Sequence, residues 1–278
     1  MTLLTVACLQ MRTGTDPETN LPVTLAAIAE AADQGAHLVA TPEMTNLVDI
    51  RPGHSDEKIT TEAKDTTLKA LRMQAAELGL WLLIGSLAVT LEEDTRKANR
   101  SYLISPNGDI VARYDKIHMF DVEVGDGQSY RESKAYRPGE KLVLASTPFA
   151  KIGMSICYDL RFPGLYRTLA QAGADLLTIP AAFTRVTGEA HWHALIRARA
   201  IETGCFVLAP AQGGLHEDGR ETFGHSLIVS PWGEIIAEAA HDEPAILLTR
   251  LDLTEVTRAR QRIPSLSNER HLRFEDER

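Results

Sequence analysis

The sequence predicts an α/β protein folded as a four-layer α-β-β-α sandwich with an internal pseudo-two-fold duplication. Segments of the first half recur in the same order in the second half, which is the mark of a repeat. Apolar runs typical of strands alternate with longer segments that carry apolar residues at helical spacing, and this alternation favours layered α/β architecture. Two equivalent halves, each a sheet covered by helices on one face only, would bury their sheets against each other within one domain.

Four pairs of segments carry the repeat, and each contains a predicted strand. The pairs are LLTVACLQM (3–11) with KIGMSICYD (151–159), QGAHLVATPEM (34–44) with AGADLLTIPAA (172–182), LGLWLLIGS (78–86) with TGCFVLAPA (203–211), and SYLISPNGDIVAR (101–113) with SLIVSPWGEIIAE (226–238). The first pair is taken to place Cys8 opposite Cys157. Each half therefore reads strand, helix, strand, helix, strand, hairpin, and the PNG and PWG segments supply the hairpin turns.

Four amphipathic segments are predicted as the covering helices because they end near Gly, a helix C-terminal signal. They are residues 21–35, 65–79, 162–173 and 190–204. We predict a single domain over 1–278, with half-repeats at about 1–115 and 150–250. The remaining tail, about 251–278, is expected to contact a partner subunit.

Charge and composition exclude several classes of protein. The 29 basic and 38 acidic residues give a net charge of −9, which argues against a nucleic-acid partner. No run of about 18 apolar residues is present, so no membrane contact is expected. The apolar N-terminus lacks the basic region of a signal peptide. Three cysteines are too few for a disulfide framework, and free thiols suit a reducing cytoplasm, where we expect the protein to be located.

The duplication is also an internal control, because reactive residues present in only one half are better candidates for function. Glu43 follows a strand and a proline where the second half has Ala181. A carboxylate at the end of a buried strand is costly unless it is paired or used, although a capping or salt-bridged Glu is the alternative. Cys157 stands between a strand and the start of a helix, where N–H groups favour a thiolate and bind an oxyanion. The alternative interpretation is a small buried hydrophobe.

Two further segments have no counterpart in the second half. RYDKIHMFDVEV (113–124) contains Lys116 and His118, and SYRESKAYRPGEKL (129–142) contains Glu132. A lysine in such a segment is otherwise a surface residue, and His118 is an alternative base for Cys157. Polar segments that connect rigid halves commonly carry function.

Together these motifs resemble the Nit branch of the nitrilase superfamily of carbon–nitrogen hydrolases. The resemblance rests on TPE ending in Glu43, YDKIHMFD around Lys116, YRESK around Glu132 and GMSICYDLRFP around Cys157, and it extends over roughly 3–274. It implies a Glu43, Lys116 and Cys157 catalytic triad with Glu132 in a supporting role. It also implies the α-β-β-α sandwich and a homodimer or a higher homo-oligomer.

The activity implied is that of a cysteine-dependent amidase. It would hydrolyse an amide bond of a small carboxylate-bearing molecule through a thioester and release ammonia, with deaminated glutathione as the leading substrate. The alternatives are an ω-amidase acting on α-ketoglutaramate, an N-carbamoyl amino acid amidohydrolase, and a catalytically silent binding protein, against which the complete triad argues. No cofactor or metal is expected, since the two histidines of HWH (191–193) point to different faces of a helix.

Residues beside the motifs are predicted to bind the substrate. They are Tyr158, Arg161, Phe183 and Thr184. A substrate carboxylate would need an arginine, for which Arg161, Arg185 and Arg137 are candidates. Arg161 has an alternative role as the ion-pair partner of Asp159.

Overall fold

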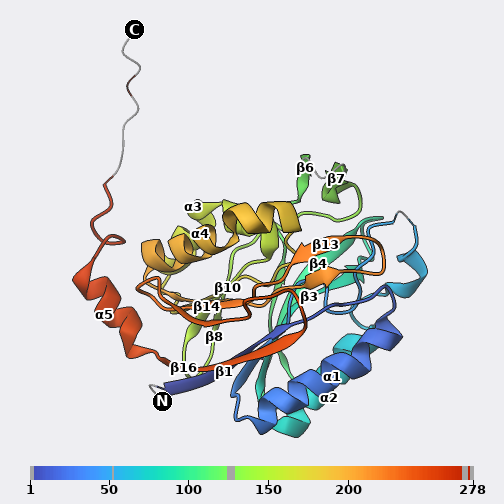
Figure 1. Ribbon diagram of the computed structural model, residues 1–278, viewed down its shortest axis with the longest axis horizontal. Coiled ribbons are helices and arrows are strands. Elements are labelled where there is room, and N and C mark those ends of the chain that lie inside the picture. The colour runs from blue at the N-terminus through green and yellow to red at the C-terminus, as the bar shows by residue number, and fades with distance from the viewer. Residues whose placement is uncertain (1–2, 52, 124–128, 271–274, 276–278) are drawn as a thin grey trace.

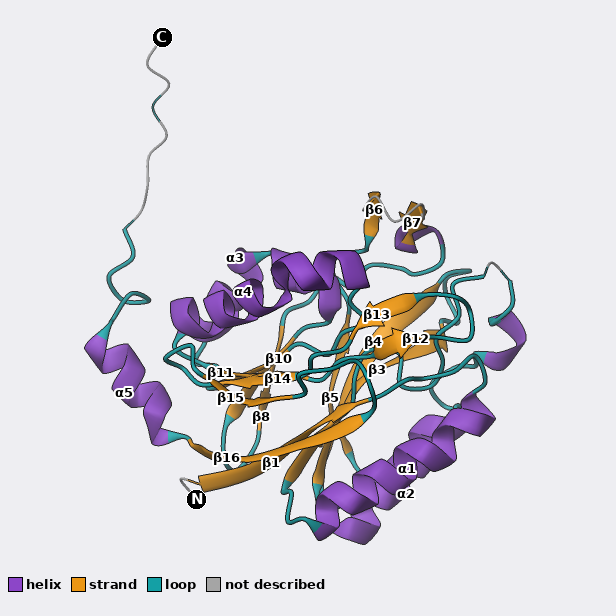
Figure 2. Cartoon of the chain, in the orientation of Figure 1, coloured by secondary structure: helices purple, strands orange, loops and turns teal. Residues whose placement is uncertain are grey.

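The computed structural model describes residues 3–51, 53–123, 129–270 and 275, and it confirms the four-layer sandwich (Figure 1). Two six-stranded sheets form the inner layers. One pair of helices covers the outer face of the first sheet and another pair covers the second (Figure 2). Among the helices of the described residues, none has the length and apolar character needed to cross a membrane.

The first sheet has the strand order β16-β1-β2-β3-β4-β5, and α1 and α2 cover it. Its elements are β1 (Leu3–Gln10), α1 (Pro17–Asp33), β2 (Leu38–Ala40), α2 (Thr66–Leu78), β3 (Trp81–Thr90), β4 (Lys97–Ile104), β5 (Ile110–Asp115) and β16 (Ala245–Asp252). Strands β1, β2 and β3 are parallel, and β4, β5 and β16 join them antiparallel.

The second sheet has the order β15-β14-β11-β10-β9-β8, and α3 and α4 cover it. Its elements are β8 (Val143–Ser146), β9 (Lys151–Met154), α3 (Pro163–Gln171), β10 (Leu176–Thr178), α4 (Arg185–Thr203), β11 (Phe206–Ala209), β14 (Leu227–Val229) and β15 (Ile235–Glu238). The remaining elements are two small hairpins, three 3-10 turns and a last helix: β6 (Asp121–Glu123) with β7 (Ser129–Arg131), β12 (Gly213–Leu215) with β13 (Glu221–Phe223), η1 (Asp56–Lys58), η2 (Glu132–Lys134), η3 (Cys157–Arg161) and α5 (Thr254–Arg262).

The ends of the helices follow from local chemistry. Asp65 caps α2, because its carboxylate accepts a hydrogen bond of 2.7 Å from the N–H of Leu68. Helices α2 and α4 end at Gly79 and Gly204, which have φ angles of 64° and 60°. Only glycine adopts this left-handed conformation without a Cβ penalty, so the predicted Gly stops are confirmed for these two helices.

The strand register corrects one detail of the predicted repeat. Cys8 pairs with Ala40 in the first sheet, and Met154 pairs with Thr178 in the second. Ala40 and Thr178 each lie two residues before a proline, so they are equivalent positions. Cys8 therefore corresponds to Met154, and Cys157 lies three residues further along. The predicted pairing of Cys8 with Cys157 was wrong because short apolar strands align almost equally well in several registers.

The core lies mainly between the two sheets. Alternate residues of β1 point to opposite faces, as the pleat requires. Val6 and Cys8 belong to the cluster shared with the second sheet, whereas Ala7 and Leu9 pack in the cluster beneath α1 and α2. Because each sheet covers the inner face of the other, the facing strand ends are brought together.

The end of the chain links the two halves. Strand β16 follows the second half in sequence but pairs with β1, so it completes the sheet of the first half. Helix α5 then lies against the second half, where Arg260 donates to the carbonyl oxygens of Ala174 at 2.6 Å and Thr203 at 3.1 Å. The contact of the tail with a partner subunit stays a prediction, and residues 271–274 and 276–278 of that tail lie outside the described residues.

Candidate active site

Glu43, Lys116 and Cys157 meet where three strands end. Glu43 follows β2, Lys116 follows β5, and Cys157 lies three residues beyond the end of β9. All three are buried, with exposed fractions of 4%, 2% and 6%. Charged side chains are rarely buried to this degree unless they are paired, so the contacts among them decide how the cluster is held.

One lysine connects the acidic residues. The Lys116 Nζ donates to Glu43 Oε1 at 2.9 Å, and to Glu132 Oε1 and Oε2 at 3.0 and 2.8 Å. The Glu43 carboxylate also acts on the Cys157 thiol, whose pKa its charge raises. The structure thus brings together all four residues predicted as catalytic.

The charges in this cluster set the protonation states. Burial alone would raise the pKa of Glu43, but the charge and hydrogen bond of Lys116 outweigh burial, and the pKa of Glu43 is lowered. Burial alone would lower the pKa of Lys116, but the carboxylates of Glu132 and Glu43 raise it well above its usual value. Burial raises the pKa of Cys157, and the charge of Glu43 raises it further. The cluster therefore holds a neutral thiol beside an ionised carboxylate and an ammonium group.

The backbone at Cys157 is unusual. Its φ angle of 48° lies in the left-handed region, which a non-glycine residue seldom occupies. The strain is held in place by the N–H of Cys157, which donates to the carbonyl oxygen of Pro180 at 2.9 Å. Such strained residues cluster at functional sites, and a sharp turn between strand and helix is how several hydrolases present a nucleophile.

The second half of the chain supplies hydrogen-bond donors to the same cluster. The N–H of Ala182 donates to Glu43 Oε2 at 2.8 Å, and the side-chain amide of Gln212 donates to the carbonyl oxygen of Glu43 at 3.0 Å. The Glu43 carboxylate is thereby fixed on both oxygens, one facing Lys116 and the other facing the second half. A carboxylate held in this way has one orientation toward Cys157.

Comparison with known proteins identifies the family. The family model "Carbon-nitrogen hydrolase" matches residues 5–261 of the chain. The chain belongs to the carbon–nitrogen hydrolase family. This enzyme is 41% identical over 267 residues to a protein of Synechocystis named deaminated glutathione amidase, with 94% of this chain and 96% of that protein covered.

Two solved structures extend the comparison. The hydrolase superposes on the NitFhit protein of C. elegans with a TM-score of 0.90 at 32% identity, covering 96% of this chain but 65% of that one. It superposes on the amidase of Nesterenkonia sp. AN1 with a TM-score of 0.81 at 26% identity, covering 96% of this chain and 94% of that one. The latter structure is a glutamate-to-glutamine variant with the acetamide moiety of fluoroacetamide added covalently at its active-site cysteine.

His118 of the hydrolase is not placed as the base for Cys157. Its Nδ1 lies 2.7 Å from Asp159 Oδ1, and its ring stacks on Phe162 with 3.5 Å between centroids. The charged groups that act on the Cys157 thiol include Glu43 and Lys116. The geometry therefore favours a Cys–Glu pair over the alternative Cys–His pair.

Arg161 does not pair with Asp159, so that alternative for Arg161 was wrong. The Asp159 carboxylate is occupied by the Tyr114 hydroxyl at 2.7 Å, by the N–H of Ile156 at 2.9 Å and by His118. Arg161 instead lies 5.2 Å from the centre of the Phe183 ring.

The other residues predicted to bind the substrate directly follow Cys157 or Ala182 in the chain. Tyr158 packs edge-on against Phe120, with 5.1 Å between ring centroids, and the Thr184 hydroxyl lies 2.7 Å from that of Thr187. Phe183 packs against Trp192 at 5.1 Å. Their contact with a substrate stays a prediction.

Asn99 belongs to the site and was missed. Its side-chain amide donates to Glu43 Oε1 at 2.8 Å and to Glu132 Oε1 at 3.3 Å, so it bridges the two carboxylates. Asn99 is fully buried in β4. An amide in the middle of a buried strand is unfavourable there, and this signal was available in the sequence. In the repeat Asn99 stands opposite Gly224, so comparison of the two halves would also have marked it.

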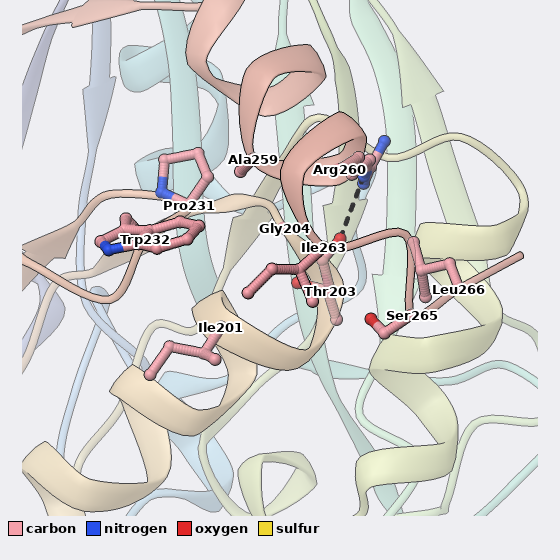
Figure 3. Close-up of a pocket in the computed structure, with 10 residues that line it drawn as sticks. All are labelled: Ile201, Thr203, Gly204, Pro231, Trp232, Ala259, Arg260, Ile263, Ser265 and Leu266. Atoms are coloured by element: carbon pink, nitrogen blue, oxygen red, sulfur yellow. Dashed lines mark hydrogen bonds between the residues drawn. The ribbon is translucent and has the colours of Figure 1, made fainter. Parts of the chain in front are cut away.

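A cavity of about 100 Å³ lies outside this site (Figure 3). It is lined by residues of the α4 end, the β14–β15 turn and α5: Ile201, Thr203, Gly204, Pro231, Trp232, Ala259, Arg260, Ile263, Ser265 and Leu266. The Arg260 hydrogen bond to Thr203 crosses it, so it belongs to the packing of α5. Among the described residues, no group of three or more His, Cys, Asp or Glu side chains is arranged to hold a metal ion.

Proposed function

We propose that this carbon–nitrogen hydrolase is an amidase in which Cys157 is the nucleophile, Glu43 the general base and acid, and Lys116 the electrostatic stabiliser. The observation that carries the proposal is the position of the buried Glu43 carboxylate, which acts on the Cys157 thiol and lies 2.9 Å from the Lys116 Nζ. A neutral thiol beside an ionised carboxylate is the starting state for proton transfer from sulfur to oxygen.

In the first step, Glu43 takes the thiol proton and the sulfur of Cys157 attacks the amide carbonyl carbon. The tetrahedral intermediate carries a negative oxygen, which the Lys116 ammonium and the N–H of Tyr158 stabilise. Loss of one such donor costs about 3 kcal/mol in the barrier. Glu43 then gives the proton to the departing nitrogen, the C–N bond breaks, and a thioester remains on Cys157.

In the second step, water replaces the amine. Glu43 takes a proton from the water while the water oxygen attacks the thioester carbon. The proton then passes from Glu43 to the sulfur of Cys157 as the C–S bond breaks. The acid leaves and the starting state is restored. Glu132 keeps its position through the N–H of Phe120 at 2.7 Å and holds Lys116 throughout.

Deaminated glutathione is the substrate that we propose, because the Synechocystis relative at 41% identity carries that name. α-Ketoglutaramate and N-carbamoyl amino acids remain the alternatives. The leaving group distinguishes deaminated glutathione from α-ketoglutaramate, and the ammonia release expected from the sequence applies only to the latter. α-Ketoglutaramate has a primary amide and releases ammonia, whereas every amide of deaminated glutathione is a peptide-type amide and releases an amine.

The experiment is a substrate panel read by mass spectrometry of the products. Purified protein is incubated with deaminated glutathione, α-ketoglutaramate, an N-carbamoyl amino acid and butyramide. We expect α-ketoglutarate and cysteinylglycine from deaminated glutathione, at the highest kcat/KM of the panel. A higher kcat/KM for α-ketoglutaramate would favour the ω-amidase alternative. No product from any compound would contradict the amidase assignment and favour a silent binding protein.

The proposal includes a homodimer or a higher homo-oligomer in the cytoplasm, without nucleic acid or membrane as a partner. The buried cysteines of the described residues, Cys8, Cys157 and Cys205, are free thiols, as suits a reducing compartment. Light scattering coupled to size exclusion would report a mass of at least twice 30.6 kDa if the oligomer forms.

A further inference from the structure

Arg220 is a cation without a carboxylate ion-pair partner among the residues that the structure describes. It follows the turn of the β12–β13 hairpin and is partly buried. Its Nε is buried and has no hydrogen-bond partner among the described residues. An unpaired buried donor of a charged group costs free energy, so it needs a partner, which a bound water, an ion or a ligand can supply.

The hairpin that carries Arg220 is held firmly. The N–H of Arg220 donates to Asp218 Oδ1 at 3.0 Å, and Asp218 Oδ2 accepts from the N–H of Ile50 at 2.8 Å. At the other side of the turn, His216 Nδ1 lies 2.9 Å from the carbonyl oxygen of Thr13. These contacts fix the backbone of Arg220 against the first half of the chain.

Both ends of the hairpin are attached beside the catalytic cluster. Gln212, which precedes β12, donates to the carbonyl oxygen of Glu43. The N–H of Phe223, at the end of β13, donates to the carbonyl oxygen of Phe183 at 2.9 Å. Phe183 follows Ala182, whose N–H binds the Glu43 carboxylate. Arg220 therefore lies on a short rigid element that begins and ends next to Glu43.

Tyr136 relates the Arg220 charge to the cluster. Its side chain is partly buried and packs against the same small apolar cluster as Met44, the residue after Glu43. The negative charges of Glu132 and Glu43 act on the Tyr136 hydroxyl, and so does the positive charge of Arg220. The guanidinium thus acts on the same hydroxyl as the catalytic carboxylates.

The neighbouring arginine gives the contrast. Arg185, at the start of α4, is surrounded by carboxylates: Glu189 at 3.3 Å, Glu221 at 3.9 Å and Asp242 at 3.6 Å. Glu221 is the residue after Arg220, so the two cations lie on the same part of the fold. The positive charge of Arg185 is satisfied within the chain, which makes Arg185 the weaker candidate for a substrate carboxylate. The Arg220 charge has no such partner in the described part of the chain.

We propose that Arg220 binds a carboxylate of the substrate. The planar guanidinium presents paired N–H groups that match the two oxygens of a carboxylate, and the fixed hairpin holds them in place beforehand. This inference rests on the proposed function, because it assumes an amide substrate that carries a carboxylate. It makes Arg220 a specificity-determining residue that sequence analysis did not mark.

The experiment measures binding, so that it needs no turnover. Arg220→Gln and the matched control Arg185→Gln are each made in the Cys157→Ala protein and titrated calorimetrically with deaminated glutathione and with its neutral diester. Arg220→Gln is expected to weaken binding of deaminated glutathione roughly 10- to 100-fold, the effect of losing a charge-assisted hydrogen bond, and to leave binding of the diester unchanged. Arg185→Gln is expected to change neither.

Two results would overturn the inference: equal affinity of the two variants for deaminated glutathione, or an equal loss of both ligands in Arg220→Gln. Arg220→Lys keeps the positive charge but loses the paired N–H groups of the guanidinium. Its affinity for deaminated glutathione is expected to lie between those of Arg220→Gln and the parent. If the parent does not bind deaminated glutathione, the proposed substrate is wrong. The role of Arg220 is then tested by titration with glutarate, a dicarboxylate as long as the acyl half of deaminated glutathione. If glutarate does not bind, or if it binds Arg220→Gln and Arg185→Gln equally well, the role of Arg220 is overturned as well.

Discussion

The turns after β2 and β10 are equivalent in the repeat, yet they contribute different groups to the catalytic cluster. Each follows a strand that ends two residues before a proline. The turn after β2 continues with Glu43 and contributes a side chain, whereas the turn after β10 continues with Ala181 and contributes backbone. The carbonyl oxygen of Pro180 holds the N–H of Cys157, and the N–H of Ala182 holds the Glu43 carboxylate. The duplication therefore supplies two copies of one scaffold, and the chemistry arises where the copies differ.

The strands β1 and β9 show the same division. In β1, Cys8 is paired within the sheet, and its counterpart in β9 is the buried Met154. Burial raises the pKa of the Cys8 thiol, and a hydrogen bond with the backbone of Ala209 offsets only part of that effect. Cys157 lies beyond the paired residues, beside Glu43 and Lys116. A cysteine inside a strand, such as Cys8, packs in the core. A cysteine at the turn that follows a strand, such as Cys157, can be a nucleophile.

The largest expected effect tests this division between the two cysteines. Cys157→Ala should lower kcat by roughly 10⁴-fold or more, because no other group can form the thioester. Cys8→Ala should keep kcat and cost about 1 kcal/mol of stability, as the loss of one buried group does. Steady-state kinetics and urea unfolding of both variants check the pair. Full activity of Cys157→Ala would refute the nucleophile assignment.

Glu43→Gln should have the next largest effect. The amide keeps the shape but cannot accept the thiol proton, so kcat should fall by about 10²- to 10⁴-fold. Intact-mass spectrometry after mixing with substrate should find no acyl-enzyme. Acyl-enzyme formation at the wild-type rate would contradict the role of Glu43 as the base and would return Glu43 to a structural role.

The same variant tests stability against pH. The pKa of Glu43 is lowered in the fold, so its ionised form stabilises the folded state above the unfolded pKa of about 4.3. That contribution is lost as the pH falls through the lower folded pKa. The difference in unfolding free energy between wild type and Glu43→Gln should therefore shrink below about pH 4. A difference that is constant from pH 7 to the acid range would contradict the lowered pKa.

Asn99→Leu should have a smaller effect. It tests what the Asn99 amide contributes that Gly224, its counterpart in the second half, does not. The leucine is similar in size but donates no hydrogen bond, so Glu43 and Glu132 lose the amide that they share. We expect a fall in kcat/KM of about 10-fold, because the carboxylates lose one fixed donor while Lys116 remains. The acid limb of the pH profile should move to higher pH, and a merely structural defect would not move it.

Much of this arrangement follows from the sequence, for physical reasons that also explain the failures. Strand and helix periodicity, Gly stops and the repeated order predicted the sandwich, because these patterns reflect local structure. Glu43, Lys116, Glu132 and Cys157 were predicted because each lies in its own motif, and the fold brings them together. The partners of Asp159, and the Arg220 Nε that is unpaired in the described part of the chain, depend on how distant segments pack together, which no local pattern records.

The smallest effect is expected at His118, the alternative base. Its ring is one of several donors to Asp159, which also accepts from the Tyr114 hydroxyl and from the N–H of Ile156. His118→Ala keeps its own backbone N–H, which donates to Asp159 Oδ1 at 3.0 Å. Asp159 therefore stays anchored, and we expect kcat to fall by no more than about threefold, as for the loss of one hydrogen bond among several. A loss as large as that of Glu43→Gln would restore the Cys–His alternative, because only a group that takes part in the proton transfer has an effect of that size.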